Sequence, residues 1–401
     1  MRMKVCVIGL GYVGLPTAIL LATNGMKVVG VDINAAIVEE TNNSSLHITE
    51  PGFDNLLKQA IASGSFRAVE TPEEADTFLI VVPTPLMTDK TPDISNVEAA
   101  TMSVLPHLKE GNLFIIESTC PVGTSEKIAG LIYARRPELK GKIHIAYCPE
   151  RVLPGNIIHE LINNDRIIGG IDKESTERVK DFYSRFVKGQ LHDADTRMAE
   201  MCKLTENASR DVQIAFANEL SLICDKAGID VRALIRLANK HPRVNILQPG
   251  CGVGGHCIAV DPYFLTTDFA NEARMIAQAR EANNYKQMWC AEKIKNAMLQ
   301  FKTDRHRYPT VAMMGLAYKP DIDDLRNSPA MKIVSDILRT TSNSKILVVE
   351  PNLRNHRLFK LEDYKDAYQA ADIIVFLVGH KEFRSLPKCD SKIVIDFCGI
   401  N

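Results

Sequence analysis

The sequence predicts an α/β fold with two doubly wound parallel-sheet domains that are joined by a central helical region. Short runs rich in Val, Ile and Leu alternate with helical patterns over residues 1–150, and the same alternation returns after Phe301. Between these parts, two long stretches carry apolar residues at steps of three and four. Alternating strands and helices are typical of right-handed βαβ units, in which helices cover both faces of a parallel sheet.

The amino-terminal part is expected to contain six strands with helices between them. The predicted strands are Lys4–Gly9, Lys27–Asp32, Thr77–Pro83, Leu113–Ser118, Ile143–Cys148 and Asp165–Gly170. The predicted helices are Val13–Asn24, Phe53–Ser63, Val97–Leu108, Ser125–Ala134 and Glu174–Phe186. The strands are short apolar runs and the helices have one apolar face, which is the pattern of buried strands under amphipathic helices.

The central part begins with one long helix, expected from Ala194 to about Lys226, and two shorter helices follow it. A glycine-rich loop, Pro249–Gly255, then precedes a second long helical run over Tyr263–Phe301. The last part repeats the α/β pattern, with helices expected at Pro329–Thr340 and around Tyr364–Ala371. Its predicted strands are Thr310–Gly315, Lys345–Glu350, Asp372–Leu377 and Lys392–Phe397. The expected domains are therefore residues 1–190, 191–301 and 302–401.

The composition excludes several classes of protein. Of the 401 residues, 45% are hydrophobic and 24% are charged, which fits neither a mainly disordered chain nor a small disulfide scaffold. Lys and Arg number 48 against 49 Asp and Glu, so no net field can hold a nucleic acid or an anionic membrane. No apolar stretch approaches the roughly 18 residues of a membrane span. The ten cysteines form neither a C-x-x-C pair nor a cluster with histidines, which predicts reduced thiols, a cytoplasmic protein and no metal site.

The segment from Gly9 to Gly14 has the spacing G-x-G-x-x-G and lies directly between the first predicted strand and helix. In that setting Gly9 permits a tight turn, Gly11 lets the backbone approach a pyrophosphate, and Gly14 lets helix and strand pack closely. Asp32 ends the second strand, 23 residues after Gly9. An acid there accepts from a ribose 2′-OH and repels a 2′-phosphate. The pattern predicts a Rossmann-like domain that binds NAD rather than NADP.

Two threonines follow the next two strands of this sheet. Thr84 lies in the sequence V-P-T-P, and Thr119 lies in E-S-T-C-P. The carboxyl ends of the strands form the ligand-binding edge of an open α/β sheet, so both threonines are candidates for cofactor contact. A loop threonine that only satisfies its own backbone is the alternative at each position.

The segment G-G-H-C-I-A-V-D, which starts at Gly254 and contains Cys257, is the most informative local pattern. Two glycines before the cysteine leave the thiol side open to a substrate. Asp261 before Pro262 predicts an N-cap with proline at the first helical position. A thiol near a helix start is more readily ionised and hence nucleophilic. By spacing alone, an inert core cysteine remains the alternative.

Lys203, Asn207 and Arg210 are spaced i, i+4 and i+7 on the first long helix and therefore share one face. This face is either a stripe for an anionic or polar ligand or simply a solvated surface. Glu150 follows the fifth strand in the sequence P-E-R and is equally compatible with a functional and a structural role. Lys319 ends the segment G-L-A-Y-K in the last part, and Arg326 follows seven residues later. Such cations suit a pyrophosphate, with a structural role as the alternative.

Taken together, these motifs resemble the UDP-glucose/GDP-mannose 6-dehydrogenase family. The glycine fingerprint, V-P-T-P, E-S-T, P-E-R, K-x-x-x-N, G-G-x-C and Y-K occur in that order between Met3 and about Gly399. Within the family, the segments H-P-R-V-N from His241 and G-G-H-C-I-A-V-D-P from Gly254 are similar to members that act on UDP-N-acetyl-D-mannosamine. The resemblance implies that the chain oxidises the C6 alcohol of a UDP-sugar to the uronate, with four electrons passing to two NAD.

The resemblance also implies a role for each site residue. Cys257 matches a nucleophile that forms a thiohemiacetal and then a thioester with the sugar. Lys203 and Asn207 match residues that handle the C6 proton and the oxyanion. The remaining catalytic matches are Glu150, as general base in hydrolysis, and Thr119 and Asp261, which order the attacking water. The implied NAD contacts are Gly9, Gly11, Tyr12, Val13, Gly14, Asp32, Thr84, Thr119 and Arg326. The implied nucleotide-sugar contacts are Arg151, Val152, Lys203, Asn207, Arg210, His241, Arg243, Gly254, Tyr318 and Lys319.

Several alternatives stay open at this stage. UDP-N-acetylglucosamine and UDP-glucose are the next candidate substrates after UDP-N-acetyl-D-mannosamine, because spacing does not reveal the shape of the sugar pocket. A two-electron dehydrogenase of the 3-hydroxyacid type and a non-catalytic sensor of NAD or nucleotide sugar are the competing functions. A homodimer is expected through the second long helix, with Arg243 acting across its interface. Cys251 lies six residues before Cys257, and a disulfide between them would block turnover.

Overall fold

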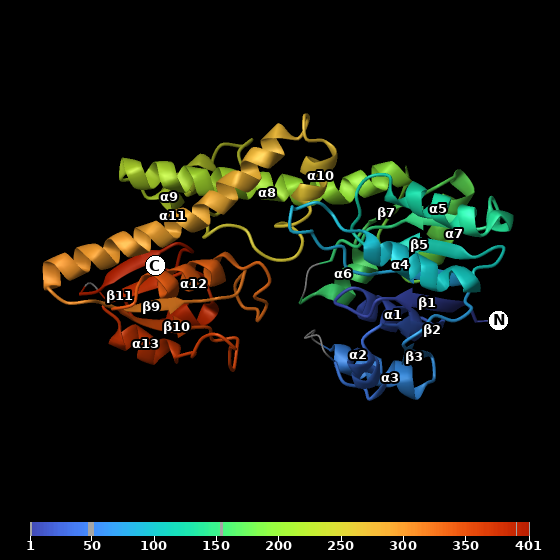
Figure 1. Ribbon diagram of the computed structural model, residues 1–401, viewed down its shortest axis with the longest axis horizontal. Coiled ribbons are helices and arrows are strands. Elements are labelled where there is room, and N and C mark those ends of the chain that lie inside the picture. The colour runs from blue at the N-terminus through green and yellow to red at the C-terminus, as the bar shows by residue number, and fades with distance from the viewer. Residues whose placement is uncertain (1, 47–51, 153–154, 390, 401) are drawn as a thin grey trace. The chain divides into compact units, whose positions relative to one another are not determined.

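The computed structural model describes residues 2–46, 52–152, 155–389 and 391–400. The chain divides into two compact units, Met1–Thr205 and Glu206–Asn401, and each unit contains its own sheet. In Figure 1 the elements of the larger sheet run from blue to green and those of the smaller sheet from orange to red. Helix α8 (Thr196–Ala227) begins in the first unit and ends in the second.

The first unit is built on an eight-stranded sheet with the order β3-β2-β1-β4-β5-β6-β7-β8. Only β6 and β7 pair antiparallel; all other described neighbours are parallel. The chain reverses direction across the sheet between β1 and β4, which is where doubly wound sheets bind their ligands. The strands are β1 (Lys4–Ile8), β2 (Lys27–Val31), β3 (Phe66–Val69), β4 (Thr77–Ile80), β5 (Leu113–Ile116), β6 (His144–Tyr147), β7 (Arg166–Gly170) and β8 (Leu191–Asp195).

Helices connect these strands and cover the sheet. Along β1, Val5 and Val7 belong to one hydrophobic core, and Cys6 and Ile8 belong to another. Side chains of a strand alternate between faces, so both faces of this sheet are buried under helices. The helices are α1 (Gly14–Thr23), α2 (Ala35–Asn42), α3 (Phe53–Ala62), α4 (Ser95–Val104), α5 (Thr124–Arg135), α6 (Ile157–Asn163) and α7 (Lys173–Tyr183), with 3-10 turns at Leu105–His107 and Pro137–Leu139.

The second unit contains long helices and a four-stranded parallel sheet with the order β10-β9-β11-β12. Its strands are β9 (Thr310–Met314), β10 (Lys345–Val349), β11 (Ile373–Phe376) and β12 (Ile393–Asp396). Its helices, besides the second half of α8, are α9 (Val231–Ala238), α10 (Pro262–Asp268), α11 (Arg274–Arg305), α12 (Pro329–Thr340) and α13 (Tyr364–Ala370), with a 3-10 turn at Lys381–Ser385. No helix in the described part of the chain combines the length and apolar character that a membrane span needs.

The structure confirms the predicted fold class, with a mostly parallel eight-stranded sheet, a parallel four-stranded sheet and long central helices. The single helical run predicted over Tyr263–Phe301 is wrong, because α10 ends at Asp268 and α11 starts only at Arg274. Side chains of Asp268 and Asn271 compete with the helical backbone, which favours a turn there. Only one of two expected short helices follows α8. The sequence H-P-R and the glycines before Cys257 leave residues 239–255 irregular.

Four elements of the first unit were not predicted: α2, α6, β3 and β8. Each is short, and two of them lack the periodic apolar signal that the prediction used. Helix α2 buries only Thr41 fully, and β8 lies at the sheet edge with a half-exposed, mostly polar sequence, L-H-D-A-D. Hydrophobic periodicity is weak in such peripheral elements, since one face has little to bury.

Candidate active site

The glycine turn after β1 has the shape that the sequence predicts for a dinucleotide site. Gly9 has a φ of +98°, and its N–H donates to Val31 O at 2.8 Å. A Cβ on Gly14 would lie 1.9 Å from Gly9 O, whereas a Cβ on Gly11 would have nothing within 4 Å. Gly9 and Gly14 are therefore required by the packing of the protein itself. Gly11 leaves open space beside the backbone, which fits a bound pyrophosphate.

Asp32 lies beside this turn and is bonded to it. Its Oδ2 atom accepts from Leu10 N at 3.0 Å, and its Oδ1 atom accepts from Asn34 N at 2.9 Å. Each carboxylate oxygen has capacity for a further hydrogen bond, so the half-buried carboxylate can still accept from a ribose hydroxyl. Tyr12 is exposed on the turn, and Val13 stands at the N-cap of α1 without a side-chain cap. The residues present thus fit NAD.

Thr84 and Thr119 meet at the ends of β4 and β5. The Thr84 hydroxyl donates to Thr119 O at 2.6 Å, and Ser118 Oγ accepts from Val82 N at 2.9 Å. These bonds tie the two post-strand loops together at the sheet edge where the cofactor is expected. The Thr84 hydroxyl keeps its acceptor lone pairs for a ligand, since its hydrogen is used by the backbone.

Glu150 lies beyond β6 and is nearly buried. Its Oε2 atom accepts from Arg166 Nη2 at 3.1 Å, and its Oε1 atom accepts from Arg151 N at 2.6 Å. Lys203 Nζ donates to the backbone carbonyl of Glu150 at 2.6 Å. The structure therefore brings together two of the predicted catalytic residues, Lys203 and Glu150. The Arg151 side chain turns to Asp165 O at 3.1 Å, and the half-buried Val152 packs against one of the cores.

A second buried acid shares the guanidinium that binds Glu150. Glu117 Oε1 lies 3.8 Å from Arg166 Nη1 and accepts a short hydrogen bond from the Tyr183 hydroxyl. Burial raises the pKa of Glu117, an effect that the Arg166 charge opposes. The sequence analysis missed Arg166 and Tyr183. Arg166 opens an apolar strand and Tyr183 ends an ordinary helix, so neither position carries a signal of its own.

In the second unit, Asn207 and Asp261 are in direct contact. Asn207 Nδ2 donates to Asp261 Oδ2 at 2.5 Å, and Asp261 is buried. The predicted position of Asp261 is correct, since it precedes Pro262 at the N-cap of α10. The Asp261 side chain makes no hydrogen bond to the first turn of this helix. Its φ of −58° and ψ of −33° are helical, and its carboxylate is held by Asn207 instead.

The loop that carries Cys257 is held tightly at its glycines. A Cβ on Gly252 would lie 3.0 Å from Asn283 O, and one on Gly254 would lie 2.7 Å from Cβ of Tyr318. Gly255 has a φ of +85°, donates to Arg326 O at 2.9 Å and accepts from Asn327 Nδ2 at 3.1 Å. The loop therefore packs between α11 and the segment 316–328, and side chains larger than hydrogen are excluded at these positions.

The segment 316–328 contains the predicted ligand residues of the last domain. The Tyr318 ring lies directly against Gly255, and Lys319 is half-buried next to it. The exposed Arg326 guanidinium pairs with Asp324, with Nε at 2.9 Å from Oδ2. The predicted role of Arg326 in NAD binding would require its guanidinium to leave or share this carboxylate. That competition was not visible in the sequence.

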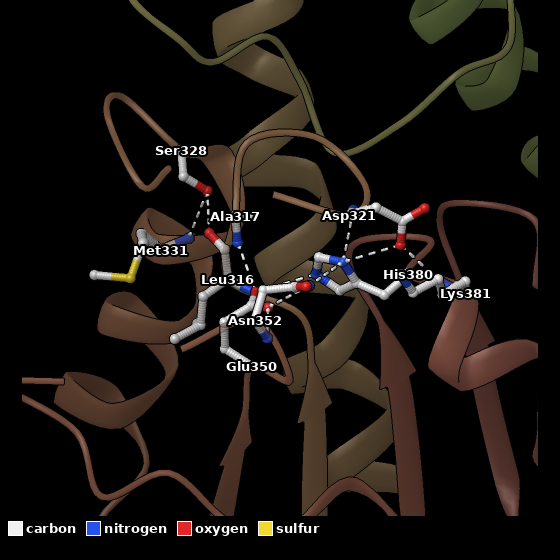
Figure 2. A network of polar contacts seen from close by, with 9 residues as sticks. All are labelled: Leu316, Ala317, Asp321, Ser328, Met331, Glu350, Asn352, His380 and Lys381. Atoms are coloured by element: carbon white, nitrogen blue, oxygen red, sulfur yellow. Dashed lines mark hydrogen bonds and ion pairs between the residues drawn. The ribbon is translucent and has the colours of Figure 1, made fainter. Parts of the chain in front are cut away.

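Figure 2 shows the polar network that fixes the start of this segment. Glu350, directly after β10, accepts from Leu316 N at 2.7 Å and from Ala317 N at 2.9 Å. Its Oε2 atom also lies 3.1 Å from Nε2 of the buried His380. Nδ1 of His380 accepts from Asp321 N at 3.0 Å, which assigns the ring hydrogen to Nε2 and makes it the donor to Glu350. Ser328 completes the network by donating to Leu316 O at 2.6 Å.

The same region contains one cluster of potential metal ligands. Single ligand atoms of Asp321, His380 and Glu382 lie within 4.8 Å of one another. The available His380 nitrogen, Nδ1, already accepts the backbone N–H of Asp321, and Asp321 Oδ1 accepts from Lys381 N at 3.0 Å. Asp321 and His380 thus already serve the hydrogen-bond network in Figure 2, which does not include Glu382.

The remaining predicted residues lie on the surface of the second unit or in its core. Arg210, His241 and Arg243 are exposed, and Arg243 N donates to His241 Nδ1 at 3.4 Å. Cys251 is a buried free thiol whose Sγ donates to Leu377 O at 3.4 Å. Burial and the neighbouring Cys290 thiol raise the pKa of Cys251. A protonated thiol bonded in this way is a poor partner for oxidation with Cys257.

A pair of glycine variants tests the turn after β1. Gly14→Ala forces a Cβ against Gly9 O and is expected to lower the free energy of unfolding by about 1–3 kcal/mol. Gly11→Ala meets no protein atom, so its unfolding curve should match that of the unchanged protein. Its methyl group fills the space of the pyrophosphate, so KM for NAD should rise about tenfold, equivalent to ~1.4 kcal/mol. Urea unfolding and NAD titration measure both effects. Equal stability losses in the two variants would contradict this division of roles.

A substitution at Glu350 tests the network in Figure 2. Burial alone raises the pKa of Glu350, but the hydrogen bonds from His380 and from the backbone N–H groups outweigh it and lower the pKa below its ordinary 4.5. Glu350→Gln places an amide NH2 among these donors and should cost about 1–3 kcal/mol at pH 7. The difference should shrink as the pH falls below about 4.5, because the ionised form then loses its advantage. Glu362→Gln, at an exposed pair with Lys360, is the control. A pH-independent difference would exclude this explanation.

Three family models match the chain in sequence order. The NAD binding domain of the UDP-glucose/GDP-mannose dehydrogenase family matches residues 3–187, and the central domain matches residues 197–285. The UDP binding domain of the same family matches residues 312–400. These matches cover most of the chain and include every motif discussed above.

Known proteins are similar over the full length. UDP-N-acetyl-D-mannosamine dehydrogenase of Salmonella typhi is 49% identical, covering 99% of this chain and 98% of that protein. NDP-N-acetyl-D-galactosaminuronic acid dehydrogenase of Ralstonia nicotianae is 47% identical, covering 99% and 96%. The solved structure of the UDP-D-ManNAc dehydrogenase of Pyrococcus horikoshii has a TM-score of 0.90 and 37% identity, covering 100% and 96%.

These matches confirm the resemblance found in the motifs, including an NAD-binding and a UDP-binding domain. They also decide against a 3-hydroxyacid dehydrogenase and a non-catalytic sensor, because the central and UDP-binding domains of the family are both present. The chain belongs to the UDP-glucose/GDP-mannose dehydrogenase family and is an NAD-dependent nucleotide-sugar dehydrogenase.

Proposed function

We propose that the chain oxidises UDP-N-acetyl-D-mannosamine at C6 to the uronate, with two NAD reduced for each sugar. The observation that carries the proposal is the G-G-x-C loop, whose glycines are required by close packing and which presents Cys257 at its end. The choice of sugar is supported by the name of the Salmonella typhi relative, which is 49% identical over 99% of this chain. NAD supplies the chemistry of a hydride acceptor in two successive steps.

In the first oxidation, Lys203 and Asn207 act on the C6 oxygen. As C6 loses a hydride, its hydroxyl proton must leave, and the carbonyl oxygen carries partial negative charge during the step. The Lys203 ammonium and the Asn207 amide stabilise this charge. The Lys203 side chain is fixed by the Glu150 carbonyl and that of Asn207 by Asp261, so each keeps one orientation while it works.

In the second oxidation, the Cys257 thiolate adds to the C6 aldehyde. A C–S bond forms and the carbonyl oxygen takes up a proton, giving a thiohemiacetal. This tetrahedral adduct can release a hydride, which a bare aldehyde does poorly, and the product is a thioester. Covalent capture also keeps the reactive aldehyde from escaping.

In the final step, water attacks the thioester carbon. Glu150 takes the water proton, the C–S bond breaks, and Cys257 leaves as thiolate. Thr119 and Asp261 order the water in this proposal. No electrons are exchanged in hydrolysis, so the overall stoichiometry stays at two NAD per sugar.

The binding residues are assigned to two ligands in this proposal. The NAD contacts are Gly9, Gly11, Tyr12, Val13, Gly14, Asp32, Thr84, Thr119 and Arg326. The UDP-sugar contacts are Arg151, Val152, Lys203, Asn207, Arg210, His241, Arg243, Gly254, Tyr318 and Lys319. The corresponding functional regions are residues 1–190 for NAD, 191–301 for catalysis and dimerisation, and 302–401 for UDP. The ten free thiols support a cytoplasmic location.

Measurement of NADH with a panel of UDP-sugars tests the proposal. The panel is UDP-N-acetylmannosamine, UDP-N-acetylglucosamine and UDP-glucose, with UDP-N-acetylgalactosamine added because of the Ralstonia relative's name. We expect the highest kcat/KM with UDP-N-acetylmannosamine and two NADH for each uronate formed. One NADH per sugar would disprove the four-electron reaction, and a preference for another sugar would correct the substrate.

Cys257→Ser is the matched variant in the same assay. A serine hydroxyl is a far weaker nucleophile than a thiolate, so the reaction should stop at the aldehyde or its adduct. Uronate should then form at less than about 1% of the normal rate, a loss of ~2.7 kcal/mol or more in barrier terms. Cys202→Ser, a half-buried free thiol on α8, is the control and should keep full turnover. Uronate formation by Cys257→Ser at the normal rate would exclude the thioester.

We also propose a homodimer that buries apolar side chains of the central helices. Phe216 and Ile223 on α8 and Met288 on α11 are 57%, 58% and 61% exposed. Exposed apolar residues grouped on long helices are typical of protein contact surfaces. Sedimentation should give twice the mass of one chain, and Ile223→Glu should shift it toward the monomer. A monomeric parent protein at micromolar concentration would contradict the proposal.

A further inference from the structure

A chain of buried polar side chains joins α8 to α11 in the second unit. Arg280 Nη1 lies 2.6 Å from Asp211 Oδ1, and Asn283 Nδ2 donates to the same oxygen at 2.8 Å. Asn218 Nδ2 donates to Asn283 Oδ1 at 2.9 Å. All four residues are buried, with exposed fractions between 0% and 3%. Breaking any of these bonds would leave a further buried polar group without a partner, beside Asp211 Oδ2 and Arg280 Nε, which have none among the described residues. The arrangement therefore restrains both helices.

The charge of Asp211 fixes which group donates and which accepts in each of these hydrogen bonds. A carboxylate can only accept, so Asn283 must turn its NH2 toward Asp211 and its oxygen toward Asn218. Asn218 must then turn its NH2 toward Asn283, which leaves its oxygen as an acceptor. Burial raises the pKa of Asp211 to about 6, with the Arg280 charge opposing the shift, so the carboxylate is ionised at neutral pH. The orientation of both amides is therefore determined.

Both ends of this row of hydrogen-bonded side chains reach the loop that carries Cys257. The free acceptor of Asn218 takes the N–H of Gly250 at 2.9 Å. At the other end, Arg280 Nη1 donates to Ile258 O at 3.4 Å. Between these anchors, Gly252 packs against the backbone of Asn283. The segment 250–258 is thus attached to the two helices at its first and last residues.

The local backbone transmits the anchor at Ile258 to Cys257. Cys257 O accepts from Val260 N at 2.9 Å and from Asp261 N at 2.8 Å. These bonds form a tight turn that includes Ile258. The carbonyl held by Arg280 is therefore in the residue next to the thiol, within a turn that has little freedom to rotate.

We propose that Asn218, Asn283 and Arg280 are positioning residues that hold Cys257 where it captures the aldehyde between the two oxidations. The inference rests on the proposed function, because it presupposes that Cys257 is the nucleophile. Addition of the thiolate forms one C–S bond to C6 and moves the carbonyl electron pair onto oxygen, which is protonated. This addition transfers no electrons to an oxidant; the second NAD would serve only in the hydride loss that follows it. The first oxidation does not use the thiol.

Because only the second oxidation uses the thiol, displacing Cys257 should slow that oxidation alone. A displacement of about 1 Å at a reacting atom can slow a step roughly 100-fold. When the loop is released, capture slows while the first oxidation continues, so free aldehyde leaves the enzyme. The ratio of NADH to consumed sugar then falls from two toward one. A loss of stability alone would lower both steps together and leave the ratio at two.

Asn218→Ala is the test variant, assayed with UDP-N-acetylmannosamine and hydroxylamine as a trap for released aldehyde. We expect capture to slow about 10–100-fold, the NADH ratio to fall clearly below two, and the aldehyde oxime to appear by mass spectrometry. Asn283→Ala removes the group that orients Asn218 without touching Gly250. It should shift the ratio in the same direction by a smaller amount, and it serves as the test if Asn218→Ala does not fold.

Ser221→Ala is the matched control. Ser221 is also buried on α8, where it accepts from Lys286 Nζ at 2.7 Å and donates to the backbone carbonyl of Asn218 at 2.5 Å. Its hydroxyl bonds neither the Asn218 amide nor the loop, so Ser221→Ala should keep a ratio of two even if stability falls. A ratio of two without oxime in Asn218→Ala and Asn283→Ala would overturn the inference. A ratio of one in the unchanged protein would instead overturn the proposed function, so the two failures are distinguishable.

Discussion

The second unit depends on one steric constraint: the loop before Cys257 fits only because it has no side chains at its glycines. Gly252 lies against α11, and Gly254 and Gly255 lie against Tyr318. Any Cβ at these positions would separate the loop from a helix or from the segment 316–328. The loop that carries Cys257 is therefore coupled by direct packing to the segment that carries Tyr318 and Lys319. The G-G-x-C pattern is required by this packing, independently of substrate access.

The two sheets use the same turn after their first strand but give it different electrostatics. Gly9 and Gly315 both have a φ of +98°, and both donate to the end of the neighbouring strand. Asp32 keeps lone pairs free beside its turn, whereas Glu350 accepts from Leu316, Ala317, His380 and Asn352. A saturated carboxylate has nothing left for a ribose hydroxyl. Glu350 therefore cannot bind a ribose hydroxyl in the way that is proposed for Asp32, although the two turns share one backbone shape.

The sequence predicted the strands well, because buried strands of parallel sheets are continuous apolar runs. The bounds of β9 and α12 agree with prediction within one residue, and the glycine turn has the predicted φ. The site was predicted only as far as motifs mark it. Arg166 and Tyr183 beside Glu150, and His380 beside Glu350, come from distant segments without a local pattern. Their positions follow from tertiary packing, which periodicity does not encode.

The long helices show most clearly why polar networks escape such prediction. Periodicity assigns apolar residues to the core, yet on α8 the buried positions include Asp211 and Asn218, while Met198 and Phe216 are 57% exposed. Burying polar residues while apolar residues stay exposed is favourable only if each of these side chains finds a partner. The Asn218 amide finds its partners in Asn283 and in Gly250 of the Cys257 loop. These hydrogen bonds have a fixed direction, which apolar contacts do not provide. The exposed apolar residues have no such bonds to make, and the proposed homodimer would remove them from water. In the two proposals, the positioning of Cys257 and the association of two chains therefore use different faces of one helix.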